Sequence, residues 1–374
     1  MERHQNLPPC PVGPHWNVDW EALSAAYPWI EALKDVPQDP IYHAEGDAWT
    51  HVGMVCKAMA ALPAWRARPE EERAVLFAAA LLHDVAKPYT TVIEGDRVRS
   101  PHHASKGAII AREVLWRMGV PMRLREQVAA LVRNHMKPFW VIEQDDPARS
   151  AIRISQTTRC DHLAILATAD AKGRICPDEA RLHENIALFV AVCEEQDCLK
   201  SPRAFPSDHT RFVYFRQQGR NPDIEAYDDT RGEAVLMSGL PGAGKDTWVR
   251  THCEGWPVIS LDALRQKLGV KPTQTQGAVI SAAREQAREH LRVGQRFVWN
   301  ATNISRSLRS RLIDIFSGYN AQIRIVHIDT PAATLYRQNK QREAIVPPHV
   351  IDGMVRKWEV PDLTEAHRVQ WVAN

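Results

Sequence analysis

The stretch EAVLMSGLPGAGKDTW, residues 233–248, decides the fold of the second half of the chain. Its apolar beginning is typical of a buried strand, and a glycine-rich segment follows it directly. The lysine and polar residues after the glycines are typical of a helix start. A strand, a glycine-rich loop and a helix in this order indicate a phosphate-binding loop, in which backbone N–H groups and the helix N-terminus bind phosphate.

One position of this loop departs from the usual pattern. The residue after Lys245 is normally a serine or threonine that ligates Mg²⁺, and here it is Asp246. A carboxylate oxygen is a competent Mg²⁺ ligand, although it places negative charge beside the phosphates. A glycine-rich turn that binds no nucleotide is the alternative. We expect ATP or another NTP, with Mg²⁺, to bind at Gly239, Pro241, Gly242, Ala243, Gly244, Lys245, Asp246 and Thr247.

Short apolar segments continue after the loop and alternate with polar, helix-like segments. The segments WPVIS, RFVWNAT and AQIRIVHID have the texture of buried strands. The alternation predicts an α/β domain over residues 232–374, with a parallel sheet, crossover helices and a helical lid.

Polar residues near the ends of these strands are candidate catalytic groups. Asp262 follows the second strand and could accept a proton from an attacking hydroxyl, or it could cap a helix. Arg265, on the same helix face, could hold a substrate phosphate. Thr302 and Asn303 could orient substrate or nucleotide, and Arg342 in the lid could reach the transferring phosphoryl group.

The first half, residues 1–204, has helical apolar spacing and few strand-like runs, which predicts an all-α bundle. His83 and Asp84 lie at the end of a long apolar helix that we expect Pro88 to close. Further histidine and aspartate side chains fall at interior positions of separate helices: His51, His135 and Asp170. Burying such groups is costly unless they pair or bind metal, so we expect a metal site. Residues 205–231, rich in proline and charge, are expected to link the domains.

The C-terminal motifs together resemble the P-loop polynucleotide 5′-kinases. The resemblance rests on the loop, on Asp262-x-x-Arg265, on Thr302-Asn303, and on Asn-x-x-Arg in the lid. It implies that Asp262 is the general base, that Arg265 binds the substrate phosphate and that Arg342 acts from the lid. Two positions differ: Gln338 stands where the family often has arginine, and Ala301 replaces a common acidic residue. Asp246 is a candidate replacement for that acid as a magnesium ligand.

The N-terminal motifs resemble the HD phosphohydrolase superfamily, and most closely the HD domains of bacterial tRNA nucleotidyltransferases. HAEGDAWTH, HDVAKP, HHASKGA, LVRNHMKP and ADAKGR carry the resemblance. It implies one or two divalent, manganese-like ions held by His51, His83, Asp84, His103, His135 and Asp170. It also implies that Lys87 and Arg174 bind phosphate oxygens. The alternative is that Lys87 is a simple surface lysine and that Arg174 has no role in phosphate binding. His43 and His162 are expected to be structural.

An HD domain followed by a polynucleotide kinase resembles the bacterial HD-Pnk end-healing enzymes. The resemblance implies that the first half hydrolyses 2′,3′-cyclic phosphate, 2′- or 3′-phosphate ends of RNA or DNA, while the second phosphorylates 5′-hydroxyl ends. A functional link to a nucleic-acid ligase follows from that chemistry. A nucleotidase fused to a metabolite kinase, a nucleotide-sensing P-loop domain, and a nucleic-acid adaptor with degenerate sites are the alternatives.

Composition limits the cellular setting. The chain has 374 residues, a formal net charge of +2 and seven cysteines without a CxxC pair. An odd number of unpaired cysteines favours a reducing cytoplasm. The apolar runs are too short for a membrane span, so we expect no membrane partner. The oligomeric state stays open, with a homodimer among the possibilities.

Overall fold

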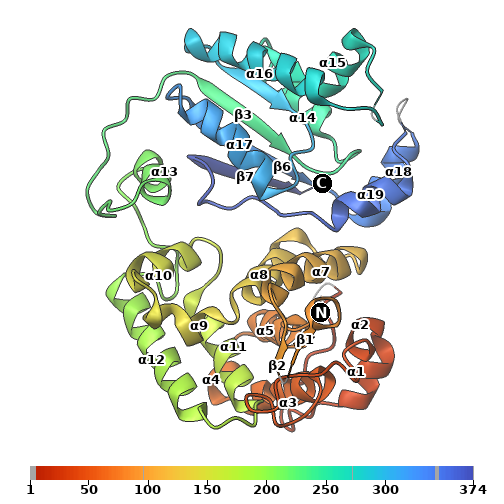
Figure 1. Ribbon diagram of the computed structural model, residues 1–374, viewed down its shortest axis with the longest axis vertical. Coiled ribbons are helices and arrows are strands. Elements are labelled where there is room, and N and C mark those ends of the chain that lie inside the picture. The colour runs from red at the N-terminus through yellow and green to blue at the C-terminus, as the bar shows by residue number, and fades with distance from the viewer. Residues whose placement is uncertain (1–5, 96, 272, 342–344, 374) are drawn as a thin grey trace. The chain divides into compact units, whose positions relative to one another are not determined.

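The computed structural model describes residues 6–95, 97–271, 273–341 and 345–373. The chain forms two compact units, with the boundary between Ala204 and Phe205. Figure 1 shows a helical first unit and a second unit built around a sheet. Among the described residues, no helix is both long and apolar enough to cross a membrane.

The first unit is a helical bundle with one small hairpin. Its elements are α1 (Trp20–Ala26), α2 (Pro28–Glu31), α3 (Ala48–Ala61), α4 (Pro63–Arg66), α5 (Glu70–Leu82), α6 (Lys87–Thr90), β1 (Val92–Glu94), β2 (Arg97–Arg99), α7 (His103–Arg117), α8 (Met122–Asn134), α9 (Lys137–Trp140), the 3₁₀ turn η1 (Val141–Glu143), α10 (Pro147–Ser155), α11 (Cys160–Lys172) and α12 (Glu179–Glu195).

Helix α5 lies at the centre of this bundle. Glutamates 70–72 in its first turn interact favourably with the helix dipole, and every residue from Ala74 to Leu82 is buried. A helix that is apolar on all sides is stable only when other helices surround it, and α3, α8 and α11 pack against α5. The centre of the bundle therefore receives whatever side chains follow the C-terminal end of α5.

The end of α5 differs from the expectation that Pro88 closes this helix. The helix ends at Leu82, with His83 as its C-terminal cap, and a turn precedes α6. Pro88 instead lies in the first turn of α6, where a missing N–H group costs nothing. The turn places Asp84 and Lys87 side by side, because the Lys87 amide donates to the Asp84 carbonyl at 2.9 Å.

The second unit is an α/β domain, as predicted. Its elements are α13 (Asp208–Arg216), β3 (Glu233–Ser238), α14 (Lys245–His252), β4 (Val258–Ser260), α15 (Leu261–Leu268), α16 (Gly277–Arg292), β5 (Phe297–Asn300), α17 (Arg306–Ser317), β6 (Gln322–Asp329), α18 (Ala332–Lys340), α19 (Pro348–Val355) and β7 (Arg368–Ala373). The strands are all parallel, in the order β4-β5-β3-β6-β7.

The strand order places β3 at the centre of the sheet, with later strands on both sides. One face of the sheet packs against α16 and α17 through apolar residues that include Phe297 and Phe316. In an open parallel sheet, ligands bind beyond the carboxyl ends of the strands where the order reverses. The loop after β3 lies at that point.

Residues 205–231, expected as a linker, fall within the second unit. Helix α13 packs on this unit, because the Phe212 ring stacks on His367 with centroids 4.0 Å apart. The Arg216 guanidinium also pairs with Asp314 of α17 at 2.8 Å. The proline-rich composition therefore describes an irregular segment that begins the second unit.

Candidate metal centre and phosphate-binding loop

Four side chains from three parts of the bundle meet at the end of α5. The His51 Nε2 atom lies 3.3 Å from His83 Nε2, 3.2 Å from Asp170 Oδ1 and 3.6 Å from Asp84 Oδ2. Helix α3 supplies His51, α11 supplies Asp170, and the turn after α5 supplies the other two. All four are buried, so water does not stabilise their polar atoms.

A second group shares Asp84 with the first. Its other carboxylate oxygen, Oδ1, lies 3.5 Å from His103 Nε2 and 4.0 Å from His135 Nε2, and these two nitrogens are 3.2 Å apart. His103 begins α7 and His135 caps α8. The six side chains that the sequence singled out therefore form two groups joined by one carboxylate, which is the arrangement that a bridging ligand requires.

The hydrogen bonds behind the histidines fix the direction of their free nitrogens. The Nδ1 atoms of His83, His103 and His135 each lie 2.8 Å from a backbone carbonyl oxygen, of Ala80, Ser100 and Val132 respectively. A carbonyl only accepts, so Nδ1 carries the proton and the lone pair is on Nε2. Carbonyl contacts of this kind are typical of metal-ligating histidines.

The close approach of paired Nε2 atoms indicates whether these residues suit a metal ion. In the His103–His135 pair, two acceptor lone pairs face each other at 3.2 Å, and neither can donate to the other. A cation between them removes the conflict. Imidazole nitrogens with carboxylate oxygens suit divalent first-row metals. The residues therefore fit one or two such ions, held by the His51 group and the His103 group.

The electrostatics favour the ligand forms of most of these groups. Burial, reinforced by neighbouring histidines, lowers the pKa of His135 to about 3. Burial raises the pKa of Asp84, but Lys87 and His83 outweigh it and hold that pKa well below its usual value. For Asp170, burial is likewise outweighed by Arg174. Neutral imidazole and ionised carboxylate are the forms that bind a divalent cation.

Two basic residues lie beside this cluster. The Lys87 Nζ atom is 2.7 Å from Asp84 Oδ2 and also donates to Gln38 Oε1. The Arg174 guanidinium makes two hydrogen bonds to Asp170, at 2.9 and 2.8 Å, and lies over the Phe139 ring. The structure thus places both predicted phosphate-binding residues at the cluster, each anchored by one of its carboxylates.

Two residues behind the cluster were missed by the sequence reasoning. Glu45 Oε1 accepts from His51 Nδ1 at 2.9 Å and from His43 Nδ1 at 2.8 Å, and Gln38 accepts from Lys87. Both lie before α3, where no helical periodicity marks a residue as interior. Glu45 falls inside the quoted HAEGDAWTH motif, and that was the available signal.

The loop after β3 has the backbone conformation that phosphate binding requires. Gly239 has φ +142°, and a Cβ atom there would lie 2.6 Å from the Ile328 carbonyl oxygen. Gly244, with φ +98°, caps α14. The Lys245 Nζ atom donates to the carbonyls of Gly239 and Leu240 at 2.9 Å, so its ammonium group lies along the loop. The backbone N–H groups at the start of α14 complete an anion-binding geometry.

The unusual aspartate has a defined partner. Asp246 Oδ1 accepts a hydrogen bond of 2.6 Å from Asn300 Nδ2, at the carboxyl end of β5. Asp246 and Thr247 are both exposed. The carboxylate thus lies at the carboxyl ends of the strands, where a nucleotide-bound Mg²⁺ would be expected.

Asp262 and Arg265 form an ion pair on α15. Ser260 caps this helix by accepting from the Ala263 amide, so Asp262 is not the capping residue. The Asp262 side chain is 78% exposed, and Arg265 also donates to Gln276 at 2.7 Å. The pair lies just past the carboxyl end of β4, and the loop likewise follows the carboxyl end of β3.

Thr302 contacts the first residue of the loop, and Asn303 contacts the end of β3. The Gly239 amide donates to the Thr302 carbonyl at 2.9 Å, while Asn303 is buried and donates to the Met237 carbonyl at 2.7 Å. This position of Asn303 suits support of the loop more than contact with a substrate.

Arg306 and Arg309 of α17 are held in ion pairs. Arg309 is fully buried and makes a bidentate pair with Glu365, and Arg306 pairs with Asp362 at 2.6 Å. These two arginines anchor the segment before β7.

The lid consists of α18 and α19. Asn339 on α18 bonds to both backbone groups of Val346, at 2.7 and 3.1 Å, and thereby spans the connection between the helices. Arg342 lies outside the described residues. Arg337, a neighbour of the substituted Gln338, is exposed and donates to Thr334.

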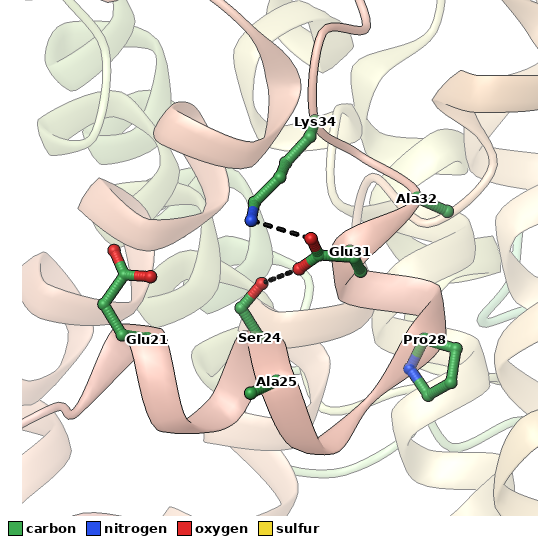
Figure 2. Close-up of a pocket in the computed structure, with 7 residues that line it drawn as sticks. All are labelled: Glu21, Ser24, Ala25, Pro28, Glu31, Ala32 and Lys34. Atoms are coloured by element: carbon green, nitrogen blue, oxygen red, sulfur yellow. Dashed lines mark hydrogen bonds and ion pairs between the residues drawn. The ribbon is translucent and has the colours of Figure 1, made fainter.

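A surface pocket between α1 and α2 shares no residue with the metal cluster or with the phosphate loop. Figure 2 shows its lining, in which Glu31 accepts from Ser24 and Lys34, each at 2.7 Å. Three of its polar side chains are thus paired with one another, and its lining includes no histidine or cysteine. It has none of the features expected of the metal centre or of the phosphate site.

Two family models match the chain. Residues 49–171 match the HD domain, and residues 235–361 match an AAA domain. The chain joins an HD domain to a P-loop domain. The first implies a divalent metal, which agrees with the cluster of histidines and aspartates, and the second implies a nucleotide with Mg²⁺.

Curated relatives are similar to part of the chain. A multifunctional CCA protein of Halorhodospira halophila is 37% identical over 122 residues, covering 33% of this chain and 27% of that protein. A multifunctional CCA protein of Xanthomonas euvesicatoria pv. vesicatoria is 30% identical over 179 residues, covering 46% and 40%. The chain thus spans less than half the length of these relatives.

Solved kinase structures also match part of the chain. A sugar kinase from Janibacter sp. HTCC2649 has 16% identity and a TM-score of 0.31, covering 38% of this chain and 85% of that chain. A gluconokinase from Sinorhizobium meliloti 1021 has 18% identity and a TM-score of 0.29, covering 38% and 83%.

Proposed function

We propose that the chain heals broken nucleic-acid ends at two separate sites. The HD site hydrolyses 2′,3′-cyclic phosphate, 2′- or 3′-phosphate ends, and the P-loop site transfers the γ-phosphate of ATP or another NTP to a 5′-hydroxyl. The observation that carries the proposal is that one chain holds both a two-group metal cluster and a phosphate loop accompanied by an Asp262–Arg265 pair.

In the HD half, the six ligands would hold one or two divalent ions. When bound, such an ion supplies Lewis-acid activation of water and of the phosphoester. Lys87 and Arg174 lie beside the cluster and would bind the non-bridging phosphate oxygens, and their present carboxylate partners would keep them in position. Water adds to phosphorus, one P–O bond breaks and the freed sugar oxygen takes a proton, so a cyclic phosphate becomes a monoester. A second hydrolysis would release inorganic phosphate and leave a 3′-hydroxyl.

In the P-loop half, Lys245 and the loop amides would bind the β- and γ-phosphates. Asp262 would take the proton of the 5′-hydroxyl. The hydroxyl oxygen would then bond to the γ-phosphorus as the bond to the nucleoside diphosphate breaks and the diphosphate leaves. Arg265 would hold the phosphate next to the accepting nucleotide, and Arg342 would act from the lid. Because Asp262 is exposed beside the sheet edge, a polymer end can reach it without unfolding the domain.

Support for a nucleic-acid substrate comes from the HD motifs, which resemble those of bacterial tRNA nucleotidyltransferases, and from similarity to proteins described as multifunctional CCA proteins. The products would be a 5′-phosphate and a 3′-hydroxyl, the ends that a ligase joins. A functional link to a nucleic-acid ligase belongs to the same proposal.

The test uses two labelled RNA oligonucleotides, one with a 5′-hydroxyl and one with a 2′,3′-cyclic phosphate. Asp262→Ala should abolish transfer to the 5′ end and leave 3′-end hydrolysis intact, and Asp84→Ala should do the reverse. Loss of both activities in either variant contradicts two independent sites. Transfer to a nucleoside but to no oligonucleotide would favour a small-molecule kinase, and ATP-dependent hydrolysis without labelled product would favour a nucleotide-sensing domain.

A further inference from the structure

Three cysteines converge in the first unit at a place that the proposed activities do not use. Cys160 is the first residue of α11, Cys193 is in the last turn of α12, and Cys198 lies in the loop that follows. Their Sγ atoms all lie within 4.8 Å of one another, and all three side chains are fully buried. The cluster shares no residue with the six ligands of the HD site.

The surrounding backbone holds the three thiols together. The Cys198 amide donates to the Cys193 carbonyl at 2.8 Å, and the Asp161 amide donates to the Leu199 carbonyl at 2.9 Å. The loop after α12 is thereby fixed against the start of α11.

We propose that Cys160, Cys193 and Cys198 form a three-thiolate site for a thiophilic divalent ion such as Zn²⁺. A tetrahedral ion with Zn–S bonds of about 2.3 Å places its sulfurs about 3.8 Å apart. Small side-chain rotations would bring the three Sγ atoms, which lie within 4.8 Å of one another, to this spacing. A disulfide would join only two of the sulfurs and give no role to the third. Three sulfur donors and no imidazole select against the ions that suit the HD cluster.

The ion would fasten the N-terminal end of α11 to the C-terminal end of α12. Helix α11 also carries Asp170, so the site would stabilise a helix on which the HD cluster depends. Its role is structural, and it stands whether or not the end-healing activity is confirmed.

The test is a Cd²⁺ titration of the full chain, reduced and carrying His83→Ala and Asp84→Ala to weaken the HD site. Only thiolate ligands give the ultraviolet sulfur-to-cadmium charge-transfer band. We expect the band to saturate at one ion per chain and to disappear when Cys160→Ser, Cys193→Ser or Cys198→Ser is added. Cys56→Ser, at another fully buried cysteine, is the matched control and should retain it.

Two measurements without cysteine substitutions keep the test decisive if a variant fails to fold. Zn²⁺ at about one hundred times its Kd should raise the Tm of the His83→Ala, Asp84→Ala chain by about 5–10 °C. Zn²⁺ should also protect these three thiols, identified by peptide mass spectrometry, from alkylation. Absence of a one-equivalent band, a band unchanged in all three serine variants, or a disulfide within the trio in freshly purified protein would overturn the proposal.

Discussion

The metal cluster and the phosphate loop are built in opposite ways. The cluster takes side chains from α3, the turn after α5, α7, α8 and α11, and all of them except the half-buried His103 are buried. The loop is one continuous segment, residues 239–247, whose ligands are mainly backbone N–H groups at the edge of a sheet. The cluster therefore depends on helix packing and on the charge of single side chains. The loop depends on local backbone conformation, and we expect Lys245 to supply its positive charge.

The largest expected effect comes from the carboxylate shared by both metal groups. Asp84→Asn keeps the shape of the side chain and removes its charge, so it should lower 3′-end hydrolysis by about a thousandfold. Kinase activity should be unchanged, and so should both activities of Asp145→Asn, at an exposed aspartate. Hydrolysis within tenfold of the parent chain would show that the two groups do not depend on a common ligand.

A smaller loss is expected when the charge of the loop is removed. Lys245→Ala should lower transfer to a 5′-hydroxyl by about 10²–10³-fold, because the backbone groups still bind phosphate. Hydrolysis at the HD site should not change. Lys267→Ala, on the exposed face of α15, is the control. An equal loss in the two lysine variants would mean that the loop lysine has no special role.

The carboxylate behind His51 offers a test of how far the cluster extends. Glu45→Gln weakens the acceptor that fixes His51 Nδ1, so metal affinity should fall about 10–100-fold while the fold is kept. Isothermal titration with Mn²⁺ measures this, with the exposed Glu184→Gln as control. Unchanged affinity would show that Glu45 does not contribute to metal binding, which would then depend on the six ligands alone.

The smallest effect is expected at Asp246. Asp246→Ser should keep kinase activity with a changed metal optimum, whereas Asp246→Ala should lower it by about tenfold at limiting Mg²⁺. Asn300→Ala removes the partner of Asp246 and separates loss of the hydrogen bond from loss of a ligand. Full activity of the alanine variant across Mg²⁺ concentrations would show that Asp246 is not a magnesium ligand.

The sequence reasoning succeeded where the signal is local. The four apolar segments expected as strands are β3, β4, β5 and β6, and the loop follows the first of them. It missed β7, an edge strand whose residues are largely exposed and which follows a segment without clear periodicity. It extended α5 to Pro88, because a proline marks a helix boundary without saying on which side the helix lies.

By itself, the sequence determined the two-domain organisation, the strand–loop–helix that cradles phosphate, and the types of residue able to bind metal. These follow from periodicity, glycine conformation and side-chain chemistry, which act over a few neighbouring residues. Only the tertiary structure decided that His51, Asp84 and Asp170 meet, that Glu45 lies behind them, and that three distant cysteines form a trio. Those contacts depend on tertiary packing, because only the packing of helices that are far apart in the chain brings these side chains within a few ångströms of one another.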